Sequence, residues 1–515
     1  MKAKWLPISA AVALALGSFS ASAVDFHGYM RAGVQNNLTN GGAVYCFGNG
    51  NAGHLMGRLG DECDTYAEIA LSQEVFNKAK NKFTVNTLVA WGTYEAAAGS
   101  AQYDYQGDSW QGVGFGGDRA GDKGHSAWHG QRASIREAWA GYTLPMGAQI
   151  WAGKRFYQRK DIHILDFYYL NDSGTGAGIE AIPVGNLGQA SFAVIKQQID
   201  ENSGATQWTY KLAQSKDKDG KNIEGQYEGT ESVDYKALNA RDVYKFDVRW
   251  TGIPLWKDAS LDLAMIWGLP STTDSQKAAA GDNPSESDLS SNSGVLLQAE
   301  YVQGNFFGGF NKLSVTYGTD GFAYVGVLNG GNHAGDSYAP GDADSWGIRV
   351  IDWGLIEQDK WNLGYSLMGA YKHADQAHWS HPNGHDYSFV VRPAYKWSNF
   401  TSTVFEAGYT TQKNTGWNGW ANPGNDHVDA YKFTLAQQFS PMTTFWSRPS
   451  IRFYVSYLGG DLMNKAYTGQ DDHNGEVSIG AQAEAWCLSD IVTARHWLPE
   501  AAFTASGLRK SCFKW

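Results

Sequence analysis

The chain has 515 residues, a formal net charge of −11, 61 glycines and an aromatic content of 14%. The acidic balance argues against a nucleic acid or a phosphate-rich ligand, because both require a basic surface. Beyond residue 23, no uninterrupted apolar run reaches the roughly 18 residues that a membrane-spanning helix needs, so a crossing of the membrane would have to use strands.

The first 23 residues have the pattern of a secretory signal peptide. Two early lysines precede an apolar stretch from Ala10 to Leu16, and Ala21-Ser22-Ala23 form a small-residue cleavage site. We expect the mature chain to begin at Val24. Residues 24–487 contain no Pro-rich or Ser-rich linker, and the same alternation of strand-like segments with Gly/Asx-rich turns runs through all of them. This uniform pattern predicts a single domain.

Short strands with alternating apolar and polar residues recur along this domain. The predicted strands are 24–34, 65–72, 83–91, 134–144, 149–153, 190–196, 243–250, 260–267, 294–302, 312–318, 345–351, 363–371, 387–391, 403–409, 431–437, 451–457 and 476–486. Long polar stretches separate some of them, at 95–125, 201–241, 270–293 and 416–429. Long loops alternating with tight turns are typical of an outer-membrane barrel. We therefore predict an all-β chain that forms a transmembrane antiparallel β-barrel.

Three aromatic residues lie on strand faces that are otherwise polar. Tyr29, Phe310 and Trp486 each share their face with charged or hydroxyl side chains. A ring in that position is a poor core residue but a good platform for stacking on the apolar face of a sugar. These positions predict a water-filled interior that binds carbohydrate. Most other aromatic residues are expected in girdles at the membrane interfaces.

Several carboxylates and arginines could serve either catalysis or binding. Glu68, Asp161 and Asp166 could supply the acid and the nucleophile of a glycosidase. A glycosidase general acid needs a raised pKa, whereas carboxylates among guanidiniums are held ionised. We therefore favour hydrogen bonding to sugar hydroxyls over catalysis. The arginines concerned are Arg31, Arg58, Arg136, Arg155 and Arg159.

Two other patterns could indicate a cofactor or a metal. Residues 112–117 are glycine-rich but neither follow a convincing strand nor open a helix, as a nucleotide-binding loop would. A histidine cluster matches no zinc spacing of fixed geometry, and consists of His373, His378, His381 and His385. We favour outer-loop roles for both, and we expect no cofactor, no bound metal and no nucleic acid partner.

Five segments carry a family likeness: 24–29, 58–68, 151–159, 166–169 and 480–486. Together they closely resemble the maltoporin (LamB) family of sugar-specific porins, over Val24 to Trp486. The resemblance implies a barrel of about eighteen strands with an inward-folded constriction loop, assembled as a homotrimer in the bacterial outer membrane. The implied function is facilitated diffusion of maltose and maltodextrins. A porin for other glucosides or small solutes, and a barrel enzyme acting on glycans, are the alternatives.

The resemblance also implies which residues contact the sugar. Trp128 is expected to reach into the pore of a neighbouring protomer, and Asn171 stands where the family carries an acidic residue. We call the implied line of aromatic residues the aromatic slide: Tyr29, Tyr66, Trp128, Phe310, Trp397 and Trp486. We call the implied set of ionisable residues the polar track: Arg31, Arg58, Glu68, Arg136, Arg159, Asp161 and Asp166, with Tyr168 as the steric element of the constriction.

The cysteines lie near the two ends of the domain. Four cysteines in an exported chain point to disulfides, and Cys46 and Cys63 match the first-loop disulfide of the family. Cys487 stands where the family has a second terminal aromatic residue, and residues 488–515 form an atypical tail. A change of reading frame after Trp486 would explain this tail, and a natural periplasmic extension is the alternative. The pairing of Cys487 and Cys512 stays open.

Overall fold

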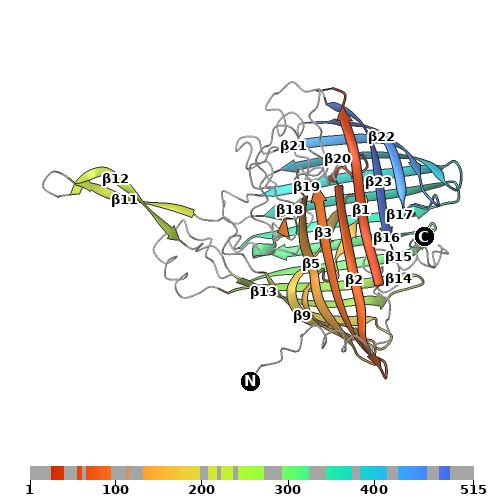
Figure 1. Ribbon diagram of the computed structural model, residues 1–515, viewed down its shortest axis with the longest axis horizontal. Helices are drawn as coiled ribbons and strands as arrows, with labels where there is room; N and C mark the ends of the chain where they lie inside the picture. The colour runs from red at the N-terminus through yellow and green to blue at the C-terminus, as the bar shows by residue number, and fades with distance from the viewer. Residues whose placement is uncertain are drawn as a thin grey trace, which may run out of the picture.

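The computed structural model describes most of the chain between residues 25 and 487. The described residues are 25–39, 55–60, 65–93, 113–114, 131–197, 207–216, 222–235, 242–271, 293–323, 327, 344–373, 383–413, 427–460 and 475–487. Their strands form one large antiparallel barrel, shown in Figure 1. The predicted all-β class is therefore confirmed.

Eighteen long strands make the wall of the barrel, and the two-residue strand β4 (Val113–Gly114) pairs with β5. β1 pairs with β23, from Gly28 opposite Cys487 to Asn37 opposite Ser478, so the first strand closes on the last. The wall strands are β1 (Asp25–Asn37), β2 (Thr65–Lys78), β3 (Asn81–Thr93), β5 (Gln131–Thr143), β6 (Gln149–Arg155), β9 (Gly174–Pro183), β10 (Gln189–Gln197), β13 (Asp242–Pro254), β14 (Ala259–Ser271), β15 (Gly294–Phe306), β16 (Gly309–Thr319), β17 (Trp346–Glu357), β18 (Trp361–His373), β19 (Gly384–Lys396), β20 (Thr401–Lys413), β21 (His427–Phe439), β22 (Ser450–Gly459) and β23 (Glu476–Cys487).

Side chains on the wall alternate between an apolar outer face and a polar inner face. On β16, Leu313, Val315 and Tyr317 are exposed, whereas Ser314 and Thr316 are buried. In a strand, successive side chains point to opposite faces, so one register sets the direction of every residue. An apolar exterior around a polar interior is the arrangement that suits a barrel surrounded by lipid.

The order of the strand ends places the short connections at one end of the barrel and the long connections at the other. The short turns include residues 79–80, 144–148, 184–188 and 255–258, which join strands in tight hairpins. At the other end, the stretch between β10 and β13 contains a hairpin of β11 (Gln207–Lys216) and β12 (Asn222–Tyr235), which projects away from the barrel in Figure 1. The polar composition of residues 201–241 predicted a loop, so this hairpin was not expected.

Strand β9 was also missed, because its glycines remove the alternation signal. The structure shows what these glycines permit. A Cβ added at Gly176 would lie 2.2 Å from the backbone oxygen of Val194, and one added at Gly178 would lie 2.4 Å from that of Phe192. Glycine therefore lets β9 approach β10 closely.

Besides residues 55–60, all of which are buried, two longer segments fold from the wall into the barrel. The inward loop, residues 156–173, connects β6 to β9 and contains the small hairpin of β7 (Lys160–Ile162) and β8 (Phe167–Leu170). Its apolar side chains pack on inner-wall residues in one buried cluster, which consists of Leu55, Ile162, Ile164, Leu165, Phe167, Tyr169, Phe310, Ile351, Trp353, Leu355, Met368 and Val390. This is the inward-folded loop that the resemblance implied.

The second segment, residues 440–449, connects β21 to β22 at the short-turn end, and we call it the inner turn. Phe445 and Trp446 pack against the same cluster. A Cβ added at Gly364 would lie 3.0 Å from the Phe445 ring and 3.4 Å from Ile164, so the inner turn and the inward loop meet at this point of the wall. The inward course of this turn was not predicted from the sequence.

Candidate functional site

Three residues of the predicted aromatic slide form one contiguous group on the inner wall. Tyr29 lies directly opposite Trp486 in the pairing of β1 with β23. Their ring centroids are 6.5 Å apart with planes at 22°, and the centroids of Tyr29 and Tyr66 are 6.0 Å apart with planes at 54°. The closing seam of the barrel therefore carries a row of three rings.

Two other predicted slide residues, Phe310 and Trp397, lie away from this row. Phe310 is only 2% exposed, and its ring meets that of Trp353 edge-on at 5.0 Å. Trp397 is 64% exposed in the turn between β19 and β20, where its indole N–H donates to Thr403 Oγ1 at 2.8 Å. Trp128 lies outside the described residues. The structure therefore does not bring Phe310 or Trp397 to the row at the seam.

Polar-track residues flank this row of rings. Arg58 Nη2 donates to the Tyr29 hydroxyl at 2.8 Å. Arg31 pairs with Asp166 at 3.5 Å, and its guanidinium carbon lies 5.3 Å from the centre of the Tyr66 ring. The arrangement places apolar ring faces beside charged hydrogen-bonding groups, which is what a pyranose with apolar faces and equatorial hydroxyls requires.

Glu68 and Arg136 lie on neighbouring parts of the wall. The hydroxyl of Tyr66 donates to Glu68 Oε1 at 2.5 Å, so the ring and the carboxylate act as one unit on β2. Arg136 is half-buried on β5. Both positions alternate inward, as the polar track requires.

The inward loop carries the remaining members of the polar track. The Arg159 guanidinium carbon lies 4.4 Å from the centre of the Tyr168 ring. Burial raises the pKa of Tyr168, Arg159 opposes this, and Asp166 and Asp161 add to it. Tyr168 is therefore a neutral hydrogen-bond donor among charged groups.

Asp161 departs from the expectation that carboxylates among guanidiniums are held ionised. Burial raises the pKa of Asp161 to about 6; Arg159 opposes this increase and Asp166 reinforces it. Desolvation therefore outweighs the attraction to the arginine. The carboxyl changes its protonation state close to the physiological range.

Ion pairs hold the inward loop against the wall. Lys160 Nζ lies 2.8 Å from Asp262 on β14 and 2.9 Å from Glu300 on β15. At the base of the loop, Asp172 pairs with Lys245 of β13 at 2.6 Å, with both side chains fully buried. A buried pair of this kind is costly to break, so the constriction is a fixed element of the barrel. These anchors were not among the predicted site residues, although alternation places their wall partners on the inner face.

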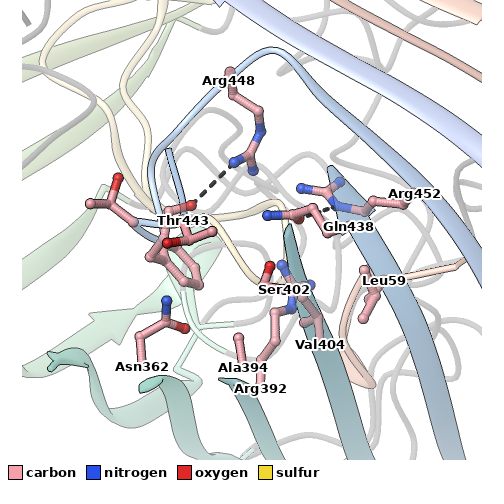
Figure 2. A pocket seen from close by; sticks show the side chains of 12 residues that line it. Leu59, Asn362, Arg392, Ala394, Ser402, Val404, Gln438, Thr443, Arg448 and Arg452 are labelled. Atoms are coloured by element: carbon pink, nitrogen blue, oxygen red, sulfur yellow. Dashed lines mark hydrogen bonds between the residues drawn. The ribbon is translucent and has the colours of Figure 1, made fainter. Parts of the chain in front are cut away.

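Glu484 holds several arginines at the end of the aromatic row. It lies 3.4 Å from Arg58, 2.7 Å from Arg448 and 2.9 Å from Arg452. Neither Glu484 nor the last two arginines were among the predicted site residues. Arg392, Arg448 and Arg452 extend toward one small pocket beside the inner turn (Figure 2).

His163 is the member of the inward loop that contacts this arginine group. Its Nε2 lies 3.2 Å from Arg448 Nη2, and its Nδ1 lies 3.4 Å from Arg58 Nη1. Burial lowers the pKa of His163 well below its ordinary value, and Arg58 lowers it further. The imidazole is therefore neutral, which avoids a further positive charge between two guanidiniums.

The departure at Asn171 lies away from open solvent. Asn171 is 1% exposed, and its side-chain oxygen accepts a hydrogen bond from the Ser173 hydroxyl. The residue therefore acts within the base of the inward loop. Cys46, Cys63 and the tail at 488–515 lie outside the described residues, whereas Cys487 closes β23 opposite Gly28.

Two comparisons of the sequence with known proteins match the same family. A family model described as LamB porin matches residues 24–487. A maltoporin from Photobacterium profundum is 32% identical over 471 residues, which are 90% of this chain and 93% of that protein.

Solved structures give a much weaker likeness. A loop-deletion form of OmpT from Vibrio cholerae is 12% identical, with a TM-score of 0.35 over 90% of this chain and 99% of that one. OccAB2 from Acinetobacter baumannii is 9% identical, with a TM-score of 0.43 over 90% of this chain and 98% of that one. Scores this low support no conclusion about function.

Proposed function

The chain belongs to the LamB porin family, and from that premise we propose that sugar passes along the row of Tyr29, Tyr66 and Trp486. The protein is an outer-membrane channel for maltose and maltodextrins and not an enzyme. The observation that supports this path is the contiguity of the three rings on the inner wall, with Arg58 and Arg31 beside them.

The geometry suits movement by repeated weak contacts. Each ring can stack on one pyranose with a free energy of about 1 kcal/mol, comparable to that of an aromatic pair. The guanidiniums and carboxylates of the polar track exchange hydrogen bonds with the hydroxyls as the chain advances. A solute must be able to leave each site as easily as it enters, so several weak sites in series transport faster than one tight site.

We propose that the inward loop selects by size and by hydrogen bonding. Tyr168, backed by Arg159, narrows the path, while Asp161 and Asp166 accept hydrogen bonds from hydroxyls. The anchors at Lys160 and Lys245 keep this loop from yielding to a bulky solute. Linear glucosides, whose sugar rings can enter the narrow path one after another, would pass most easily.

The other three predicted slide residues have different roles in this proposal. Trp397 would contact the sugar at the short-turn end of the barrel, where its ring is exposed. Phe310 packs under Trp353, so a direct contact with sugar would require the cluster to shift. Trp128 would act on the pore of a neighbouring protomer, and we propose a homotrimer on that ground. Analytical ultracentrifugation in detergent tests the trimer, and a monomeric species would contradict it.

Ion current through single channels in planar bilayers tests the function. Maltohexaose should block the current reversibly and with saturation. A general porin would conduct ions without block, and a glycan-degrading enzyme would release shorter products into the chamber. Comparison of maltohexaose with sucrose and cellohexaose tests the preference for maltodextrins over other glucosides.

We also propose processing after Ala23, a barrel formed by residues 24–487, and a tail at 488–515 that arises from a change of reading frame. Intact-mass measurement of the purified protein tests the processing after Ala23 and the presence of the tail. A chain that begins at residue 1 would contradict the signal peptide, and one that ends near residue 487 would contradict translation of the tail.

A further inference from the structure

The inner turn brings a guanidinium onto the last ring of the aromatic row. The guanidinium carbon of Arg448 lies 4.2 Å from the centre of the Trp486 ring. Trp486 projects from the inner face of β23, and the inner turn lies within the barrel, packed on the cluster under the inward loop. Arg448 therefore approaches the ring from the lumen.

Arg448 is held in this position from three sides. Its Nε donates to Glu484 Oε2 at 2.7 Å, which fixes it to the wall. Its Nη1 donates to the backbone oxygens of Phe445 at 3.1 Å and Ser447 at 2.9 Å, which fixes it to its own turn. Its Nη2 points at His163 Nε2, which links it to the inward loop. Figure 2 shows the side chain extending from the turn toward the pocket.

The charge of Arg448 persists at neutral pH. Burial lowers the pKa of Arg448 to about 10, and Glu484 opposes this decrease. The guanidinium is thus a permanent cation over an indole face, the geometry of a cation–π contact. A pyranose that stacks on the same face would have to displace it.

We propose that Arg448 covers the lumenal face of Trp486 and competes with sugar for it. This inference rests on the sugar path proposed above and adds a residue that weakens sugar binding at its last ring. The cover weakens the last stacking site, so a sugar that reaches Trp486 leaves the row readily. A channel needs such a limit, because a row of rings that ends in its tightest site would retain its ligand.

The competing explanation is that Arg448 only supports the fold of the inner turn. The two explanations predict opposite signs. Loss of a support disorders the site and weakens sugar binding, whereas loss of a competitor exposes the ring and strengthens it. A change that tightens binding is therefore a readout that a structural role does not produce.

The test is maltohexaose block of single-channel current for wild type and Arg448→Gln, with residence times taken from current fluctuations. We expect the half-blocking concentration to fall by about threefold to tenfold in the variant, which corresponds to loss of a cation–π contact. The change should appear as a longer residence time of the sugar. Arg448→Lys, which keeps the charge but not the planar group, should give a smaller decrease, and it carries the test if Arg448→Gln does not insert.

The matched control is Arg452→Gln, which removes a second guanidinium from Glu484 without removing a ring contact of Trp486. We expect no tightening in this control. The role of Arg448 would be wrong if the half-blocking concentration were unchanged or higher in the Arg448 variants, or if binding tightened equally in the Arg452 control. Either outcome would leave the proposed sugar path standing. Absence of block in the wild type would overturn the proposed sugar path and this inference with it.

Discussion

Tyr29 and Trp486 stand directly opposite each other across the seam where the first strand of the barrel meets the last. Their rings lie 6.5 Å apart and nearly parallel, at 22°. Closure of the barrel therefore completes the aromatic row, since Tyr29 and Trp486 lie near opposite ends of the barrel sequence. A barrel that failed to close would lose the sugar path together with its wall.

Removal of the Tyr29 ring tests the row. Tyr29→Ala should raise the half-blocking concentration of maltohexaose about fivefold to tenfold, because one stacking contact of roughly 1 kcal/mol is lost. Tyr29→Phe keeps the ring and loses only the hydroxyl bonded to Arg58, so its effect should be smaller. Tyr317→Ala, on the outer face, is the control and should leave the block unchanged. If Tyr29→Ala and Tyr29→Phe raised the half-blocking concentration equally, the hydroxyl and not the ring would account for the effect.

The ion selectivity of the pore should depend on pH through Asp161. The pKa of Asp161 in the folded protein is about 6, above the ordinary value of ~4, so its negative charge is present above pH 6 and lost below it. We expect the ratio of cation to anion permeability to fall on the order of twofold between pH 7.5 and pH 5, because cations lose a favourable charge at the constriction.

Reversal potentials in a KCl gradient measure this ratio. Asp161→Asn should show the lower ratio at every pH in this range and should lack the step near pH 6. Persistence of the step in the variant would assign it to another group. The same raised pKa makes the ionised carboxyl unfavourable for folding, so the contribution of Asp161 to stability should improve as the pH falls through 6 toward ~4.

Loss of the buried anchor should destabilise the barrel. Lys245→Met leaves the carboxylate of Asp172 buried without its ammonium partner at 2.6 Å, and we expect the free energy of unfolding to fall by about 3–5 kcal/mol. Denaturant unfolding in lipid vesicles, followed by tryptophan fluorescence, measures this. The double variant Lys245→Met/Asp172→Asn should recover part of the loss. If the double variant were as unstable as the single one, the unpaired charge would not be the cause.

The approach of the segment 55–60 to the wall depends on Gly408. A Cβ at this position would lie 1.9 Å from the backbone oxygen of Met56, so Gly408→Ala must displace the segment that carries Arg58. We expect the half-blocking concentration of maltohexaose to rise about threefold or more, since Arg58 would lose its contact with Tyr29.

Gly369→Ala is the control for this substitution. The nearest atoms to its Cβ belong to the outer-face ring of Tyr387, at 3.3 Å, and that ring can move into lipid. Block and insertion should be unaffected. Normal sugar block in Gly408→Ala would show that the position of Arg58 does not depend on this glycine.

Alternation alone identified Tyr29 and Trp486, because the direction of a strand side chain is a local property of period two. It could not identify Trp397, which follows the end of β19 in a turn. It also could not reveal that Phe310, although on the inner face, is covered by the inward loop, since burial inside the barrel depends on a segment far away in the chain. Glycines concealed β9 for a local reason, the loss of a side-chain pattern.

The family resemblance supplied the polar track, and the structure added groups that neither approach had named. Arg448, His163 and Glu484 meet only because the inner turn, the inward loop and the last strand converge on one point. Nothing in the local sequence of residues 440–449 distinguishes a turn that folds inward from one that projects outward. Their contact is decided by packing on the buried cluster.

By itself, the sequence determined that the chain forms a barrel and which side chains face its interior, because each register places apolar residues toward lipid and polar residues toward water. Only the tertiary structure decided which interior residues meet. Closure of β1 on β23 joined Tyr29 to Trp486, and the inward folding of two connections brought Arg448 onto the last ring. These contacts link residues far apart in the chain, and their energies arise from packing and charge pairing that no local pattern records.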